Sequence, residues 1–195
     1  MITKKQQLQE ALFDLGWKHR SSEGQNIFTK YIDDHHFVGL TPSIRRKMDG
    51  GVVVSTNPGF GDWRFCCCYA YIADDKATAW PQIMDYNLKL CFENGEREDV
   101  IKMSSEAIDW ALQQNYPQIL HTYSEMPTNA PGNAPLRHLT ALAMLSRIDV
   151  LHAYIEAFES GNRLGFVPYI NIGIIDRAYE IASSGISGFV VPVPS

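Results

Sequence analysis

Apolar residues near the start of the chain recur with the period of an α-helix. One face follows the i, i+4, i+7 spacing of an amphipathic helix and consists of Leu8, Leu12 and Leu15. Thr3 and Gln6 have the spacing of a capping box, and Gly16 can adopt the left-handed conformation that ends a helix. The pattern predicts a first helix that begins after Thr3 and ends at Gly16.

From residue 17 to residue 72 the chain consists of short segments rich in β-branched and aromatic residues, separated by Gly, Asp, Asn and Pro. These segments predict four strands, at residues 26–32, 37–41, 51–55 and 64–72. The sequence Asp33-Asp34-His35-His36 predicts a hairpin loop between the first two strands, and residues 57–61 predict a turn before the fourth. Consecutive strands with short connections favour an antiparallel meander with helices on one face.

The helical period returns in the second half of the chain. Ile83, Met84, Leu88 and Cys91 form one apolar stripe, which Asn94-Gly95 can end, and residues 108–112 form another after the capping candidate Ser104. Tyr116-Pro117 predicts a break at which the next helix begins. Further stripes predict helices at residues 136–143 and 151–158, which meet near Asp149 and end at Gly161, and at residues 170–182 before Gly185. The apolar tail 188–194 is expected to pack as an edge strand or against the helices.

The predicted fold class is α+β, with an N-terminal helix and an antiparallel four-stranded meander followed by a C-terminal helical bundle. The pattern favours a single domain over residues 1–195. Residues 126–135 contain three prolines, one glycine and two asparagines, so they form a loop that could set apart a helical subdomain over residues 136–195.

Composition and charge narrow the classes of partner. Apolar residues make up 45% of the chain, and no apolar run is long enough for a secretory signal or a membrane span. We therefore expect a cytoplasmic protein with no membrane partner. The net charge is −5, and the 17 basic residues are scattered apart from Arg45-Arg46-Lys47, so we expect no nucleic-acid partner.

No catalytic or metal-binding motif stands out. In a strand, Cys66 and Cys68 point away from Cys67, so the three thiols could not converge on one metal, and packing in the core is the preferred interpretation. His35 and His36 are expected on a solvated loop. The sequence thus indicates no catalytic residue, no metal site and no cofactor, although a fold could still bring Cys67, His121 or His138 together in a pocket.

The N-terminal third resembles a group of bacterial domains. The matching segments are residues 12–18, which end in Leu-Gly-Trp-Lys, then Phe28-Thr29-Lys30, then the strand-rich stretch up to Trp63. The group comprises bacterial domains of unknown function and includes immunity-like proteins encoded beside polymorphic toxins. The resemblance implies a protein that binds a toxin and blocks it.

The leading functional hypothesis is an intracellular protein-binding module, an immunity-type inhibitor of a bacterial toxin. An acidic protein could mask a basic toxin by charge complementarity. The candidate partner-binding residues are Asp33, Asp34, Asp74, Asp75 and the aromatic anchor Trp63. Three alternatives remain open. One is a small enzyme whose site is assembled from residues distant in sequence. The others are a secretion chaperone or delivered effector with an exposed apolar groove or an obligate dimer, and a structural helical-repeat adaptor.

Overall fold

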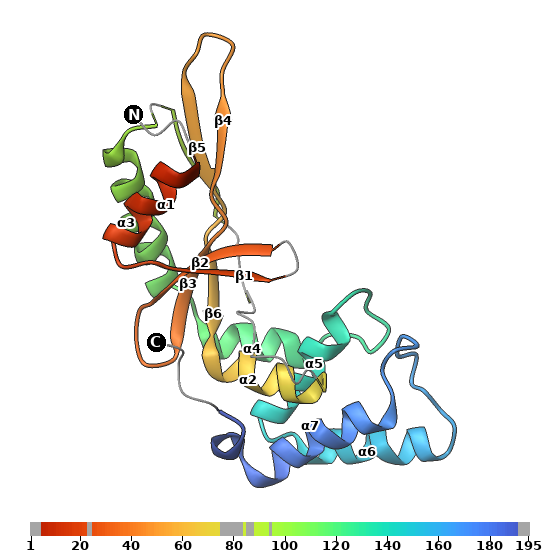
Figure 1. Ribbon diagram of the computed structural model, residues 1–195. Helices are drawn as coiled ribbons and strands as arrows, with labels where there is room; N and C mark the ends of the chain where they lie inside the picture. Colours follow the sequence, from red (N-terminus) through yellow and green to blue (C-terminus); the bar gives the residue numbers. More distant parts are fainter. Residues whose placement is uncertain (1–4, 23–24, 75–83, 85–87, 94, 191–195) are drawn as a thin grey trace. The chain divides into compact units, whose positions relative to one another are not determined.

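The computed structural model describes residues 5–22, 25–74, 84, 88–93 and 95–190. The chain divides into two compact units (Figure 1). The first, which we call the sheet unit, contains Met1–Asp62 and Ile83–Gln114. The second, the helical unit, contains Trp63–Gln82 and Asn115–Ser195. Each unit is described by itself.

The sheet unit contains two antiparallel sheets. The four-stranded sheet has the order β1-β2-β3-β6, and the three-stranded sheet has the order β4-β5-β7. The strands are β1 (Lys18–Ser22), β2 (Gln25–Tyr31), β3 (His36–Leu40), β4 (Ser43–Arg46), β5 (Val52–Thr56), β6 (Gly59–Asp62) and β7 (Leu90–Phe92). The chain leaves the first sheet after β3 at Thr41-Pro42, where Pro42 supplies no N–H for a ladder hydrogen bond, and it returns at β6.

Two helices accompany these sheets, and Figure 1 shows them side by side. Helix α1 (Lys5–Asp14) buries Leu8, Ala11 and Leu12. It ends at Asp14, and Gly16, two residues later, has a φ of +80°, the left-handed conformation expected there. Helix α3 (Arg97–Leu112) packs against α1, β3 and β7.

A buried hydrogen bond fixes the chain after α1 to helix α3. The indole Nε1 of Trp17 donates to Ser104 Oγ at 2.9 Å. Trp17 is 2% exposed and Ser104 is 5% exposed, so each polar group finds its partner inside the core. Trp17 is therefore a core residue rather than a surface anchor.

The helical unit is built around one central helix. Helix α5 packs against all four other α-helices of this unit. The elements are α2 (Trp63–Ile72), α4 (Tyr116–Ser124), α5 (Ala134–Met144), α6 (Ile148–Glu159), α7 (Ile172–Ser184) and the short 3-10 turn η1 (Ile186–Gly188). Their shared core consists mainly of Leu, Ile and Ala side chains, including Leu139, Leu142 and Ile175.

Several boundaries in this unit confirm the sequence predictions. Asn115 Oδ1 accepts a hydrogen bond from the Gln118 N–H at 3.1 Å, and Pro117 lies in the first turn of α4. Gly161 and Gly185 follow α6 and α7 with φ of +83° and +80°. The described part of the tail packs against the helices, since the ring of Phe189 lies 4.7 Å from that of Tyr71.

The prediction of a fourth strand at residues 64–72 is wrong. Trp63–Ile72 is helix α2, which begins directly after β6, so Tyr69 and Tyr71 are helical residues too. The turn predicted at 57–61 is also shorter, because Gly59–Asp62 is a strand. A continuous apolar run has no polar positions to reveal its period, so a buried helix and a buried strand look alike in the sequence.

Two helix predictions also need correction. The pattern predicts a helical stripe that includes Cys91, but Cys91 lies in strand β7, which pairs with β5. Residues 83, 85–87 and 94 of the predicted segment lie outside the described part of the chain. Helix α3 begins at Arg97 and not near Ser104, because Glu96 and Asp99 form a capping box at its start. The predicted cap Thr3 of the first helix is likewise outside the described residues.

The Pro-rich segment 126–135 lies within the helical unit, where residues 126–133 connect α4 to α5 and residues 134–135 begin α5. None of the described helices is both long and apolar enough to cross a bilayer.

Candidate functional site

The turn between β2 and β3 is organised by the carboxylate of Asp33. Asp33 Oδ1 accepts hydrogen bonds from the backbone N–H groups of His35 at 2.8 Å and His36 at 2.7 Å. The other oxygen, Oδ2, lies 2.7 Å from His36 Nδ1. An aspartate that binds the backbone two and three residues ahead is typical of an Asx turn. The predicted hairpin turn is therefore confirmed, except that His36 lies in strand β3 and not in a solvated loop.

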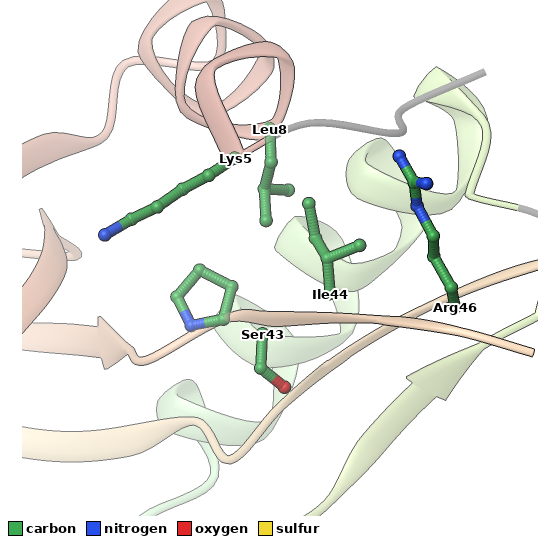
Figure 2. Close-up of a pocket in the computed structure, with 6 residues that line it drawn as sticks. Lys5, Leu8, Ser43, Ile44 and Arg46 are labelled. Carbon is green, nitrogen blue, oxygen red and sulfur yellow. The ribbon is translucent and has the colours of Figure 1, made fainter.

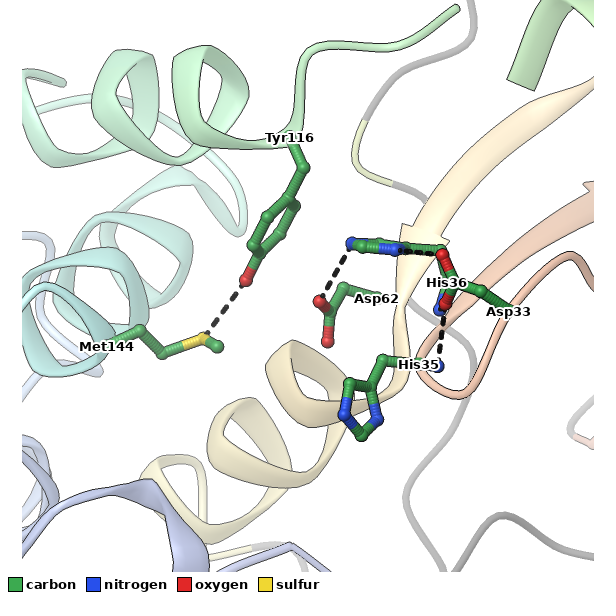
Figure 3. A network of polar contacts seen from close by, with 6 residues as sticks. All are labelled: Asp33, His35, His36, Asp62, Tyr116 and Met144. Atoms are coloured by element: carbon green, nitrogen blue, oxygen red, sulfur yellow. Dashed lines mark hydrogen bonds and ion pairs between the residues drawn. The ribbon is translucent and has the colours of Figure 1, made fainter. Parts of the chain in front are cut away.

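His36 also faces a second carboxylate from another strand. In the β3–β6 ladder His36 lies directly opposite Asp62, and His36 Nε2 is 3.3 Å from Asp62 Oδ2 (Figure 3). Asp62 is fully buried, whereas the side chain of His36 is 22% exposed. The imidazole stacks on Phe60 at a centroid distance of 5.3 Å. We call Asp33, His36 and Asp62 the acid–histidine cluster.

Burial and hydrogen bonding act in opposite directions on the pKa of Asp33. Partial burial raises the pKa, but the hydrogen bonds from the backbone N–H groups of His36 and His35 lower it, and the side chain of His36 adds to that effect. The net result is a pKa lowered from 3.8 to about 2. Asp33 thus stays ionised at every physiological pH.

The acid–histidine cluster joins two parts of the four-stranded sheet. The imidazole of His36 lies between two carboxylates: Nδ1 hydrogen-bonds Asp33 Oδ2, and Nε2 lies within ion-pair distance of Asp62 Oδ2. With Nδ1 facing Asp33 and Nε2 facing Asp62, both ring nitrogens are directed at carboxylates. This geometry ties the β2–β3 turn to the end of β6 and does not favour a general base. Among the residues that the structure describes, no group of three or more metal-binding side chains suits a metal ion.

Figure 3 also draws a polar contact that belongs to the helical unit. The hydroxyl of Tyr116 lies 3.9 Å from the sulfur of Met144 and joins the start of α4 to the end of α5. It is a weak contact between a hydroxyl and a thioether, and it adds no reactive group.

A second candidate site lies at the β4–β5 hairpin. Lys47 N–H donates to Gly51 C=O at 2.8 Å, and Gly50 N–H donates to Lys47 C=O at 3.1 Å. Gly50 has a φ of +85°, as a three-residue hairpin turn with a left-handed last residue requires. Asp49 Oδ1 accepts from Gly51 N–H at 2.9 Å. This well-bonded turn holds Met48 completely in solvent.

An open pocket of about 450 Å³ lies between β4 and the start of α1. The partly exposed Pro42 and Ile44 supply most of the apolar surface, above the nearly buried Leu8, and Lys5 and Arg46 supply positive charge (Figure 2). Ser43 completes the lining. The pocket therefore combines an apolar floor with a basic rim, which suits a ligand that carries both an apolar group and an anion.

The predicted partner-binding residues are divided between the two units. Asp33 and Asp34 lie together on the exposed β2–β3 turn. Asp74 is exposed at the end of α2, in the other unit, and Asp75 lies outside the described residues. Trp63 is fully buried at the start of α2. An interface anchor needs exposed ring surface, so Trp63 fits the core interpretation better.

The other reactive side chains have separate structural surroundings. Cys66, Cys67 and Cys68 are free thiols buried along α2, and their predicted place in the core is confirmed, although in a helix rather than a strand. His138 is 3% exposed; its Nδ1 lies 3.1 Å from the Tyr123 carbonyl oxygen and its Nε2 lies 3.1 Å from the Tyr154 hydroxyl. His121 is exposed on α4, 3.2 Å from Glu125.

The sequence indicated Asp33 as a candidate residue, but it indicated neither the pairing of His36 with Asp62 nor the pocket beside β4. The pairing of His36 with Asp62 depends on β3 and β6, which are separated by two strands of the other sheet. The signal that could have indicated a binding surface is the basic cluster Arg45-Arg46-Lys47, which lies between two predicted strands in an otherwise acidic chain.

Comparison with known proteins gives one match. Residues 4–183 match a family of unknown function, DUF6990, and the chain belongs to this family. No curated protein and no solved structure matches the chain.

Proposed function

We propose that this protein is an intracellular protein-binding module, an immunity-type inhibitor that binds a bacterial toxin and blocks it. The observation that carries the proposal is the β4–β5 hairpin, which holds the fully exposed Met48 on a turn closed by several hydrogen bonds. A rigid turn that presents an adaptable apolar side chain is well suited to protein contact, because Met is enriched at interfaces and little entropy is lost on ordering the turn.

The β2–β3 turn offers a second contact surface, which is negatively charged. Asp33 is held ionised by its own turn, and the neighbouring Asp34 is exposed. Two exposed carboxylates on a fixed turn support attraction of a basic partner, which raises the rate of association. The resemblance of the N-terminal third to immunity-like proteins points in the same direction. Catalysis at the acid–histidine cluster is disfavoured, because both ring nitrogens of His36 face carboxylates.

The test combines site-directed cross-linking with a functional readout. A photoreactive amino acid replaces Met48, and the matched control places it at Gln118, an exposed position on helix α4 of the helical unit. Cells of the source organism are irradiated and the cross-linked protein is identified. The proposal expects one partner at position 48 and not at 118, and it expects that this partner arrests growth when expressed alone and not when expressed with this chain.

Two results would overturn the proposal. One is equal labelling of unrelated proteins at both positions, which would show that Met48 has no specific partner. The other is a partner whose expression is harmless, which would leave a binding protein without an inhibitory function.

A further inference from the structure

Strand β4 has one edge that no described strand covers. It pairs with β5 alone, in the register Ser43↔Ser55 to Arg46↔Val52. Ladder hydrogen bonds alternate along an antiparallel strand. Because the Lys47 N–H bonds to Gly51, the alternation directs the backbone groups of Arg45 and Ser43 toward β5 and those of Ile44 and Arg46 away from it. An outward-facing pair of N–H and C=O groups at two alternate residues is a template for one more strand.

The same two residues also contribute to the pocket. Residues 44 and 46 share one face of the strand because side chains alternate. Figure 2 shows the side chains of Leu8 and Ile44 near one another, with Lys5 and Arg46 on either side of them. A strand laid along β4 would therefore place every second side chain over the pocket: one on the apolar floor and the next, about 6.8 Å farther on, near a cation.

Charge decides what kind of segment fits. Lys5 and Arg46 are exposed and form no ion pair with any residue that the structure describes, whereas Lys47 is paired with Glu93 at 2.7 Å. The chain as a whole has a net charge of −5, so two cations at one pocket form a local exception. A carboxylate is the natural counterpart of an Arg with free donors.

We propose that β4 receives an extended segment of the partner protein as an added strand. The segment carries an apolar side chain that packs on Leu8 and Ile44, and an Asp or Glu two residues away that binds Arg46 or Lys5. Main-chain hydrogen bonds to Ile44 and Arg46 provide affinity, and the pocket provides specificity. This inference rests on the proposed protein-binding function and adds the mode of binding.

Synthetic peptides test the mode without the natural partner. Short fluorescein-labelled peptides of β-branched residues around a Leu-x-Glu core are titrated against the full chain and followed by fluorescence anisotropy. We expect the Leu-x-Glu peptide to bind roughly five- to tenfold more tightly than the Leu-x-Gln peptide, and the Leu-x-Lys peptide to bind most weakly of the three. At about 0.5 M salt we expect this preference to be lost. Equal binding of all three peptides would overturn the proposed carboxylate contact.

Backbone methylation of the peptide tests strand addition directly. N-methyl groups on alternate residues remove the N–H groups that face β4, whereas N-methyl groups on the intervening residues leave them intact. We expect a loss of about tenfold or more from the first set and little change from the second. Similar losses from both sets would exclude an added strand.

The chain offers a matched pair of variants. Arg45 and Arg46 are both exposed and adjacent, but they lie on opposite faces of β4. We expect Arg46→Ala to weaken Leu-x-Glu binding about fivefold or more and Arg45→Ala to leave it nearly unchanged, with unfolding midpoints that show both variants fold. Equal effects would overturn the inference. If no peptide binds but cross-linking at Met48 captures a toxin, strand addition alone is refuted. If the peptides bind but no toxin is captured, the inhibitor function alone is refuted.

Discussion

The Asp33 turn permits a quantitative prediction about charge and stability. We consider the substitution Asp33→Asn. The amide oxygen of Asn can still accept the backbone N–H groups of His35 and His36, but the negative charge that those groups and the His36 ring stabilise is lost. The substitution therefore removes the charge and keeps the shape of the turn.

The magnitude follows from the pKa. A carboxyl group whose pKa falls from 3.8 in the unfolded chain to about 2 in the folded one stabilises the fold by about 2.5 kcal/mol at neutral pH. The side chain of Asp33 is 53% exposed, so solvent screening reduces this to roughly 1 kcal/mol. Because the folded pKa is the lower one, this contribution is fully present above pH 3.8 and is lost as the pH falls toward 2.

Two measurements check this reasoning. Urea unfolding near neutral pH is expected to show Asp33→Asn less stable than the parent chain by roughly 1 kcal/mol, with a difference that shrinks in acid. Carbon-detected NMR titration reports the pKa of Asp33 itself. In His36→Gln the backbone N–H donors remain, and they lower the pKa more than the His36 side chain does, so the pKa of Asp33 should stay below 3.8. A value near 3.8 in the parent chain, or a full return to it in His36→Gln, would refute this account.

Three further predictions concern the core. Burial lowers the pKa of His138 below 6.5, so the unfolded chain binds a proton at this residue more readily than the folded chain does. The free energy of unfolding should therefore fall as the pH drops below 6.5. In urea titrations, His138→Asn should lose most of that pH dependence. A thiol reagent should modify Cys91 rapidly in the native protein and Cys66–Cys68 only after unfolding, because Cys91 alone is exposed; fast reaction of all four thiols would contradict the buried helix. Trp17→Phe should cost about 1–2 kcal/mol of unfolding free energy by leaving the Ser104 hydroxyl without its donor, and a much smaller loss in the Ser104→Ala background would confirm the coupling.

The helices with a clear apolar stripe and a local end signal could be predicted from the sequence. Gly16 and Gly185 end α1 and α7 in the left-handed conformation that their positions indicated, and Asn115 with Pro117 begins α4. The β2–β3 hairpin could be predicted as well, because Asp33 forms its turn with the next three residues. In each case the deciding interactions lie within a few residues of one another.

The segment Trp63–Ile72 shows where local patterns stop being informative. Its residues are almost all apolar, so neither the helical nor the strand period is visible, and packing within the helical unit decides for a helix. The same limit applies to Leu90–Phe92, a three-residue strand that exists through its pairing with β5.

The sequence by itself determined the α+β class, the α1 helix, most of the helices after residue 115 and the acidic hairpin turn, since those depend on period, caps and turn residues. Only the tertiary structure placed His36 opposite Asp62 and set α1 beside β4 to form the pocket. Contacts of that kind join residues far apart in the chain, and their energies depend on burial and on strand pairing, neither of which a local pattern contains.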